Sequence, residues 1–395
     1  MKKLFITLAI VILIATLIFT GCAQAPKDAK VLKIGVIWGL TGPGSQSQLT
    51  WRDAALLCAD YINQKGGVAV NGEKYQIECL VEDSKMSPPG AVDAATKLVF
   101  QDGVKFIVGG IVPVINEGVM SITELNKVLY VSMRTDIVSP DRPYFFCPAY
   151  SYAAPLPGLY QVMREKYPQV NSMGYIVEDE TGARAVAEVS RNIAGAMGFK
   201  VMEPEIHPWE APEYYPVWTK VINQNPDAMD VGLKLPNAMA ACIKQGRELG
   251  YKGPMITSTA GDPPEIINMI GSKELATDFF YPALDVYGTE APPMVKEMVK
   301  LWEAKYKTPL DEGGPDSWDT IWVLVQAIEK AQSLDPTDVK TAWENMDTFE
   351  SIKGPAKMGG AQTFGIKHMG FPPCPIIRIQ NGQVEFIRWF DPWMP

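Results

Sequence analysis

Residues 31–83 restrict most strongly how this chain can fold. Val31–Ile37 is a short, β-branched run that ends in a loop rich in Gly, Thr and Pro, as is typical of a buried parallel strand. Apolar residues recur at helical spacing from Trp51 to Ile62, and a second strand is expected at 75–81. This order predicts a βαβ unit with a right-handed crossover. The loop after its first strand then lies at the carboxyl edge of a sheet, where open α/β folds bind ligands.

The alternation of strands and helices continues to about residue 136 and then starts again after Pro148. A chain of 395 residues exceeds one ordinary domain, so two lobes are expected. Near the C-terminus, Asn381-Gly382 separates two β-type runs at 376–380 and 384–389, which is a strong hairpin signal.

The N-terminus reads as a targeting segment. Lys2 and Lys3 precede an apolar run of about sixteen residues, which is short for a membrane span of roughly 20 residues. Residues 1–21 are therefore expected to be a signal peptide, and 22–30 a short tether. The ending Phe19-Thr20-Gly21-Cys22 resembles a bacterial lipoprotein cleavage box, which implies a lipid on Cys22. Phe19 departs from the usual Leu of that box, so ordinary secretion stays open as the alternative.

Composition excludes some partners and leaves others open. The formal net charge is −9 and no Lys/Arg run is present, which argues against nucleic acid and anionic lipid surfaces. Contact with the membrane is expected through the lipid only. Besides Cys22 there are five cysteines, without metal-ligand spacing: Cys58, Cys79, Cys147, Cys242 and Cys374. They are interpreted as small buried hydrophobes, although Cys58 and Cys79 could meet in one core.

Enzymatic motifs are missing from the sequence. It contains no GxSxG, HExxH or P-loop pattern, and only two histidines, His207 and His368, which are interpreted as structural. We therefore expect a protein that is not an enzyme and that needs neither a cofactor nor a metal.

The ordered features of residues 31–83 also resemble a known family. A strand, Gly39-Leu40-Thr41-Gly42-Pro43, a helix ending in Ile62-Asn63-Gln64-Lys65-Gly66-Gly67, and a strand ending in Val81-Glu82-Asp83 are similar to solute-binding proteins of the branched-chain amino acid type. Proteins of this family serve ABC importers. The resemblance implies a type I periplasmic binding protein fold: α/β, with two doubly wound parallel-sheet lobes joined by a three-strand hinge. It also implies a monomer that closes around a small molecule and meets the importer's permease subunits outside the cytoplasm.

The resemblance also implies where the lobes divide. Lobe 1 is expected to comprise 31–147 and 279–355, and lobe 2 to comprise 148–278 and 356–395. The ligand then lies between the lobes, against loops at the carboxyl ends of both sheets.

In the first lobe, the resemblance places two hydroxyl residues of the amino-acid binders at Val112 and Pro113, which offer no hydroxyl. Ser47 stands where the family has a tyrosine, whereas Thr135 matches a threonine that touches the ligand. In the second lobe, Thr181, Leu235 and Thr259 stand where the family has an aromatic residue, a tyrosine and an acid, and Asp262 is near enough for an acid still to reach the pocket. Most of the clamp for an α-amino acid is therefore expected to be missing.

What replaces the clamp is apolar, with one cation. Trp38, Ile111, Val112 and Leu235 are apolar, and Arg134 follows the fourth strand. This set predicts a pocket for a hydrophobic or aromatic carboxylic acid, with Trp38 in a loop that offers little core to fill. Arg134 could instead form a surface ion pair with Asp136 or Asp141, which would contribute little.

Three alternatives remain at this point. The same fold could serve a ligand-sensing receptor, the ligand could be a branched-chain amino acid after all, or the chain could be an extracytoplasmic hydrolase.

Overall fold

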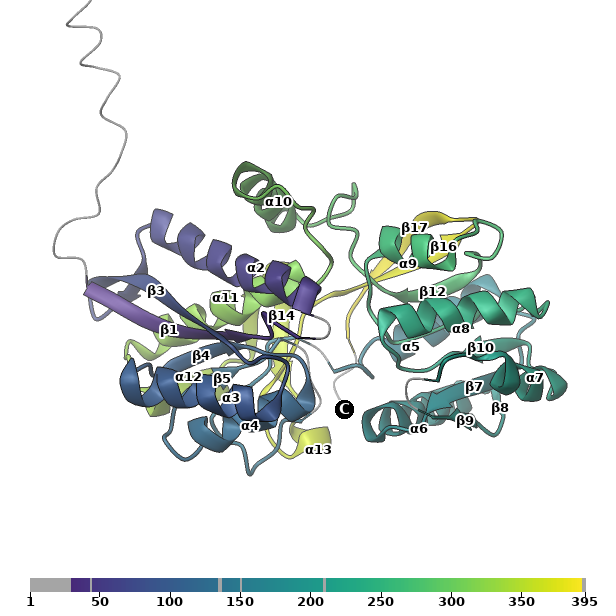
Figure 1. Cartoon of the computed structure of the whole chain (residues 1–395), viewed down its shortest axis with the longest axis horizontal. Coiled ribbons are helices and arrows are strands. Elements are labelled where there is room, and N and C mark those ends of the chain that lie inside the picture. The colour runs from purple at the N-terminus through teal and green to yellow at the C-terminus, as the bar shows by residue number, and fades with distance from the viewer. Residues whose placement is uncertain (1–29, 43–44, 134–136, 150, 209–210, 393–395) are drawn as a thin grey trace, which may run out of the picture.

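The computed structural model describes residues 30–42, 45–133, 137–149, 151–208 and 211–392. These residues form two lobes, which lie side by side in Figure 1. The predicted signal peptide, Cys22 and the predicted tether up to residue 29 lie outside the described residues, whereas Lys30, expected as the last tether residue, already belongs to a strand.

The first lobe is built on a six-stranded sheet with the order β2-β3-β1-β4-β5-β6, parallel except for β2. The elements up to the end of this sheet are β1 (Lys30–Trp38), α2 (Ser45–Gln64), β2 (Val68–Val70), β3 (Glu73–Asp83), α3 (Pro88–Thr96), the π-helix η1 (Lys97–Gln101), β4 (Phe106–Gly109), α4 (Pro113–Thr123), β5 (Leu129–Val131) and β6 (Phe145–Phe146). The βαβ unit expected at 31–83 is confirmed, with its two strands paired in parallel.

Both faces of this sheet are buried, as its nearly unbroken apolar strands predict. Ile34, Val36 and Trp38 of β1 share a core with α2 and with α11 (Gly314–Ala331). Ile37 points to the opposite side, into a core with α3 and α4. Figure 1 shows α2 and α11 on one side of the sheet and α3 and α4 on the other. This alternation follows from the two-residue period of a strand.

The second lobe is built on an eight-stranded sheet with the order β17-β16-β12-β11-β10-β7-β8, and β9 also pairs with β7. Its first elements are α5 (Leu156–Lys166), β7 (Ser172–Glu178), α6 (Thr181–Ala196), β8 (Lys200–Val201), β9 (Glu205–His207), α7 (Tyr215–Asn223), β10 (Ala228–Asp230), α8 (Pro236–Glu248), β11 (Met255–Ile256), α9 (Pro263–Ile270) and β12 (Phe279–Pro282). Helices α5 and α6 cover one face of the sheet, and α7, α8 and α9 cover the other.

The chain then returns to the first lobe and crosses back once more. The remaining elements are α10 (Pro293–Lys305), α11, α12 (Pro336–Glu344), β13 (Thr348–Ser351), β14 (Gly354–Gly359), α13 (Ala361–Phe364), β15 (Met369–Phe371), β16 (Cys374–Gln380) and β17 (Gln383–Phe390). Strands β16 and β17 form the predicted hairpin. Its turn residues Asn381 and Gly382 both have positive φ, as a two-residue turn of type I′ requires.

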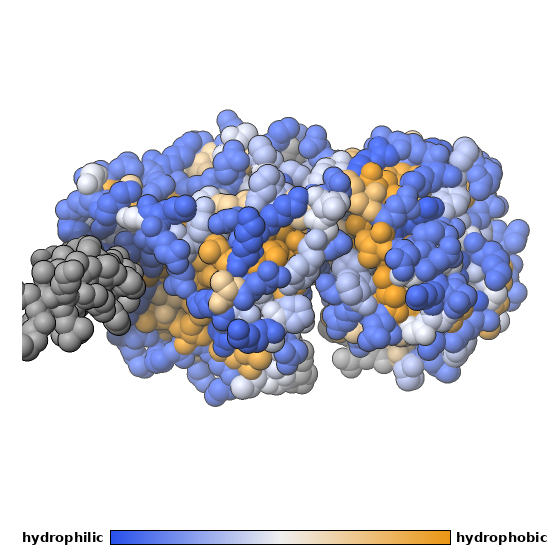
Figure 2. Space-filling view, turned by 90° about the horizontal axis from the view of Figure 1, so that it is seen from above, coloured by the Kyte–Doolittle hydropathy of each residue, from blue (hydrophilic) through white to orange (hydrophobic). Residues whose placement is uncertain are grey.

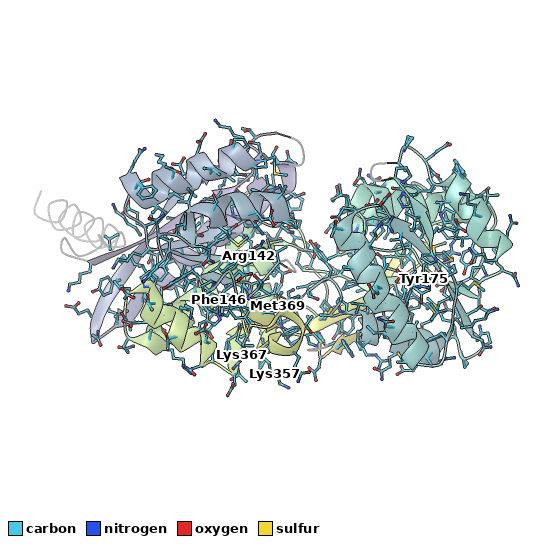
Figure 3. The ribbon with its side chains drawn as sticks, turned by 90° about the horizontal axis from the view of Figure 1, so that it is seen from below. Arg142, Phe146, Tyr175, Lys357, Lys367 and Met369 are labelled. Atoms are coloured by element: carbon cyan, nitrogen blue, oxygen red, sulfur yellow. The ribbon has the colours of Figure 1, made fainter. Side chains whose placement is uncertain are left out.

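Strand pairing moves two of the expected crossings between the lobes. Strand β12 pairs with β11 and β16, so 279–282 belong to the second sheet rather than to the first lobe. Residues 356–371 were expected in the second lobe, but β13, β14 and β15 form a small antiparallel sheet on the first lobe. Met369 bridges to Cys147, and Figure 3 shows Met369 beside Phe146 in the first lobe, far from Tyr175 in the second. The second crossing therefore follows Pro282, and the third follows Phe371.

None of the five cysteines of the described region is joined to another by a disulfide. Four are buried, as expected of small hydrophobes, and Cys79 is partly exposed.

Candidate ligand-binding site

Trp38 ends β1 at the carboxyl edge of the first sheet. The expectation that it stands in a loop with little core to fill is wrong, because its side chain is fully buried in the first-lobe core. Its ring packs against Trp51 of α2, with 5.7 Å between the ring centroids and 60° between the planes. Trp38 therefore lies at the carboxyl edge of the sheet, but its side chain points into the core of the lobe.

The loop after Trp38 is tied to the end of β3 by Asp83. Its carboxylate accepts hydrogen bonds from the Leu40 and Lys85 backbone N–H groups at 2.8 and 2.7 Å, and from the Thr41 hydroxyl at 2.6 Å. Burial acts to raise the pKa of Asp83, but these hydrogen bonds outweigh it and hold the pKa below its ordinary value. Two loops that are 40 residues apart in sequence are thus fixed to each other.

Gln48 fills the space between these two loops. It is buried in the first turns of α2, accepts the Gly39 N–H at 2.7 Å and donates to Met86 Sδ at 2.8 Å. Ser47, its neighbour and a predicted ligand contact, lies exposed in the first turn of α2.

A recess too narrow to hold a water molecule lies beside Trp38. Two further predicted site residues, Ile111 and Val112, line it. The remaining lining residues are Ile37, Gly39, Gln48, Ser84, Met86, Gly110, Ile115 and Tyr130. The structure therefore brings three of the first-lobe predictions together in one place, and none of the residues that line the recess is charged.

The floor of the recess is held by a buried hydrogen-bond network. The Tyr130 hydroxyl lies 2.9 Å from the Gly109 carbonyl oxygen and 2.8 Å from Asn116 Oδ1. The Ser132 hydroxyl accepts from Asn116 Nδ2 at 2.9 Å and lies 3.0 Å from the Gly110 carbonyl oxygen. Gly110 has φ +78°, and a Cβ at this position would collide with Asn116 and with the Tyr130 hydroxyl. Glycine is therefore required where the chain passes this network.

Val112 is the N-cap residue of α4 and offers no side-chain hydrogen bond, while Pro113 opens the helix. This arrangement agrees with the expectation that no hydroxyl is available there. Arg134 and Thr135 lie outside the described residues, so their roles stay predictions.

In the second lobe, Thr259 is buried and interlocked with Lys234. The Lys234 N–H donates to Thr259 Oγ1 at 2.9 Å, and Thr259 Oγ1 donates to the Lys234 carbonyl at 2.9 Å. Leu235, the next residue, is 56% exposed and precedes α8. Thr181 is exposed at the first residue of α6, which follows β7, whereas Leu235 follows β10 and Thr259 follows β11. Asp262, whose pKa burial raises to about 6, caps α9 by accepting the Glu265 N–H at 3.1 Å.

Sequence reasoning missed a buried cation beside Leu235. Lys234 Nζ donates to His207 Nε2 at 2.9 Å, and both side chains are buried. His207 Nδ1 lies 2.9 Å from the Pro208 carbonyl, so Nδ1 carries the proton and Nε2 accepts. Burial and the neighbouring ammonium lower the pKa of His207 to about 4, and burial also lowers the pKa of Lys234. Lysines are seldom fully buried, so neither its residue type nor its spacing could have indicated this pair.

His368 is a structural histidine, as predicted. It is fully buried, stacks on Phe146 with 3.7 Å between ring centroids, and contacts the Phe145 carbonyl and Glu344 at 2.9 Å each.

The two carboxyl edges belong to different lobes, and a notch separates the lobes in the space-filling view of Figure 2. In the part of the chain that the structure describes, three or more His, Cys, Asp or Glu side chains never gather as a metal site. No helix in the same ranges is long and apolar enough to cross a membrane.

Comparison with known proteins identifies the architecture. Residues 31–382 match the family described as periplasmic binding protein. A leucine-, isoleucine-, valine-, threonine- and alanine-binding protein of Pseudomonas aeruginosa is 26% identical over 357 residues, covering 87% of this chain and 89% of its own.

Two solved structures share the fold at low sequence identity. The branched-chain amino acid transporter substrate binding protein of Streptococcus pneumoniae, in complex with isoleucine, has a TM-score of 0.74 and 17% identity over 92% of this chain and 100% of its own. A solute binding protein of an ABC transporter from R. palustris, in complex with benzoate, has a TM-score of 0.70 and 14% identity over 92% of this chain and 98% of its own. With the family match covering most of the chain, this protein belongs to the periplasmic binding protein family, which is a family of binding proteins rather than enzymes.

Proposed function

We propose that this protein is the extracytoplasmic solute-binding component of an ABC importer, and that its solute is a hydrophobic or aromatic carboxylic acid rather than an α-amino acid. The observation that carries the choice of solute is the uncharged recess at the carboxyl edge of the first sheet. An ammonium group in this recess would have no carboxylate partner among the lining residues. A buried charge without a partner is strongly unfavourable, but the neutral N–H and O–H donors of Trp38 and Ser84 suit a carboxylate and, as donors, cannot satisfy an ammonium.

The start of α4 supports the same choice. Val112 and Pro113 provide neither a hydroxyl nor, at Pro113, an N–H for a ligand carboxylate. Ile111, Val112 and Ile115 instead offer an apolar wall to a ring or a chain. The R. palustris protein, which has the same fold, was solved with benzoate, so the fold accommodates this class of ligand.

Transport requires that the ligand favour one arrangement of the lobes. A solute that contacts both carboxyl edges binds the closed arrangement more tightly than the open one, and so shifts the population toward closure. The permease would then recognise the closed protein.

The anchor position suits this role. Strand β1 begins at Lys30, at the end opposite Trp38, and its nine residues span roughly 25 Å. A lipid on Cys22 would therefore attach to the first lobe at the edge away from the recess, and would leave the carboxyl edges free.

The test is calorimetric titration of the protein, after removal of any copurified ligand, with benzoate and with leucine. We expect benzoate to bind and to raise the melting temperature, and leucine to bind at least a hundredfold more weakly. Tight leucine binding without benzoate binding would contradict the proposed solute class and would favour the branched-chain alternative.

Substitution Val112→Ser supplies a control in the same chain. It restores one hydroxyl at the start of α4, so leucine binding should gain relative to benzoate binding. An unchanged ratio would show that this position does not select the solute.

A further inference from the structure

Two residues that line the recess each have a buried polar side-chain atom without a hydrogen-bond partner among the described residues. Trp38 Nε1 and Ser84 Oγ lie in side chains that are 0% and 1% exposed, and neither atom has a hydrogen-bond partner. The Ser84 backbone N–H donates to the Trp38 carbonyl at 2.9 Å, so the two residues are held next to each other. Donors that stay buried and unpaired cost free energy, so a native structure that keeps two of them together calls for an explanation.

The other polar side chains of the recess are satisfied. Gln48 holds Gly39 and Met86, and Tyr130 lies within the network of Gly109 and Asn116. Among the lining residues, a partner is missing at Trp38 Nε1, which can only donate, and at Ser84 Oγ, which can donate or accept, so one acceptor could satisfy both. A carboxylate offers two oxygens and about four lone pairs, and can accept from both donors at once.

Met86 lines the same recess. Its sulfur accepts a hydrogen bond from Gln48, and a Cβ on Gly39 would collide with this sulfur. The Met86 side chain therefore lies against the loop that follows Trp38. With Met86 in place the recess has no room for a water molecule that could satisfy the donors.

The backbone around Met86 is strained. Lys85 and Met86 have φ +53° and +48°, a conformation that non-glycine residues rarely adopt, and here it occurs twice in succession. Methionine has three rotatable bonds and few packing demands, so its side chain can leave without disturbing the lobe. Its departure would open the recess to a ligand.

We propose that Trp38 Nε1 and Ser84 Oγ form the head-group site for the carboxylate of the solute, and that Met86 plugs this site until the ligand displaces it. This inference rests on the proposed function, because it uses the acid class of the solute. The two donors are neutral, and their hydrogen bonds become charge-assisted when the carboxylate enters. Ile111 and Val112 then pack against the apolar body of the acid.

The principal experiment measures benzoate affinity of the full protein with Ser84→Ala. Since the Ser84 hydroxyl has no partner in the ligand-free protein, its removal should leave the melting temperature unchanged or slightly higher. Benzoate binding should nevertheless weaken at least tenfold.

Thr123→Val is the matched control. Thr123 also carries a buried hydroxyl without a partner, but it lies at the end of α4 and does not line the recess. This variant should show the same small change in stability as Ser84→Ala and bind benzoate within twofold of the unaltered protein.

Met86→Ala tests the plug separately. By emptying the mouth of the recess, it should raise the association rate for benzoate several-fold in stopped-flow tryptophan fluorescence. Met86→Leu, which keeps the bulk, should leave that rate within twofold. Equal rates for all three proteins would overturn the plug.

The outcomes separate this inference from the proposed function. If the protein binds benzoate and Ser84→Ala binds it equally well, the head-group site is overturned while the solute class stands. If leucine binds instead and Ser84→Ala weakens leucine tenfold, the carboxylate site stands while the solute class fails. If neither benzoate nor leucine binds, both fail.

Discussion

Trp51 donates its indole N–H to Asp311 Oδ1 at 2.9 Å, which joins α2 to the segment before α11 across 260 residues of sequence. The same carboxylate oxygen accepts the Gly313 and Gly314 N–H groups at 3.1 and 3.0 Å. Because Trp51 also packs on Trp38, the position of the recess depends on a residue that follows α5 to β12 of the second lobe in sequence.

Asp311 should make stability depend on pH. Burial, with the neighbouring Glu312, raises the pKa of Asp311 to about 7, well above the value of an unfolded aspartate. The folded state therefore binds more protons than the unfolded state between about pH 4 and 7, and the free energy of unfolding falls as the pH rises through this range. Asp311→Asn keeps an acceptor for Trp51 and removes the titration, so it should be more stable than the unaltered protein at pH 8 by up to about 4 kcal/mol.

Urea unfolding at pH 5 and pH 8 would measure this difference. Glu303→Gln, which changes an exposed carboxyl on α10, is the control and should show the pH dependence of the unaltered protein. If Asp311→Asn showed the same pH dependence as the unaltered protein, the Asp311 carboxyl of the unaltered protein would have to be ionised in the folded state at pH 5.

Two helical glycines should respond to alanine in opposite directions. A Cβ on Gly246 of α8 would lie 2.5 Å from Trp218 Cε2 in the second-lobe core, whereas a Cβ on Gly195 of α6 would meet only Val201 Cγ2 at 3.7 Å. Gly246→Ala should destabilise the protein by about 1–3 kcal/mol through overpacking. Gly195→Ala should stabilise it by up to about 1 kcal/mol through helix propensity. Thermal unfolding of both variants would test the packing of this lobe.

The Lys234–His207 pair can be followed by NMR, because the chain has only two histidines. Lys234→Met removes the ammonium that, after burial, helps to lower the pKa of His207, so this pKa should rise from about 4. The His368 resonance provides the internal control, since this residue lies in the other lobe. An unshifted His207 titration would mean that burial alone sets its pKa.

Cys22 should decide where the protein resides in the cell. If Cys22 carries a diacyl lipid, Cys22→Ser should release the protein from membranes, because each buried CH₂ contributes about 0.8 kcal/mol. Fractionation of cells that express the two forms gives the answer. Equal membrane association would leave ordinary secretion as the explanation of the N-terminal segment.

The sequence predicted most of the fold because the information is local. Strand β1 and helix α2 are visible in the spacing of their apolar residues, and the hairpin turn is visible in Asn381-Gly382. Helix α9 was missed because its two prolines and short length resemble a loop, although Asp262 caps it. The small sheet at 348–371 was missed because its strands have three to six residues and lack clear alternation.

The site was less predictable, because burial at the sheet edge is a tertiary property. Ile111 and Val112 line the recess, and their contact with a ligand stays a prediction. Trp38 lines it from the first-lobe core, where its ring packs against Trp51 of α2. Gln48 and Met86 carry no motif, and they meet only because Asp83 ties their loops together. The contact between Lys234 and His207 could be found only in the structure, because it depends on β9 and β10 both pairing with β7.

The late strand hairpin has a consequence for how the chain folds after export. Ile376, Ile377 and Ile379 of β16 are at most 1% exposed and complete the second-lobe sheet, while α10 to β15 complete the first. Neither half can therefore close its core while the last hundred or so residues are still crossing the membrane, and until β16 arrives the edge of β12 stays open to pairing with other chains. A truncation that removes only β16 and β17 should therefore aggregate rather than yield a folded protein with one shortened lobe.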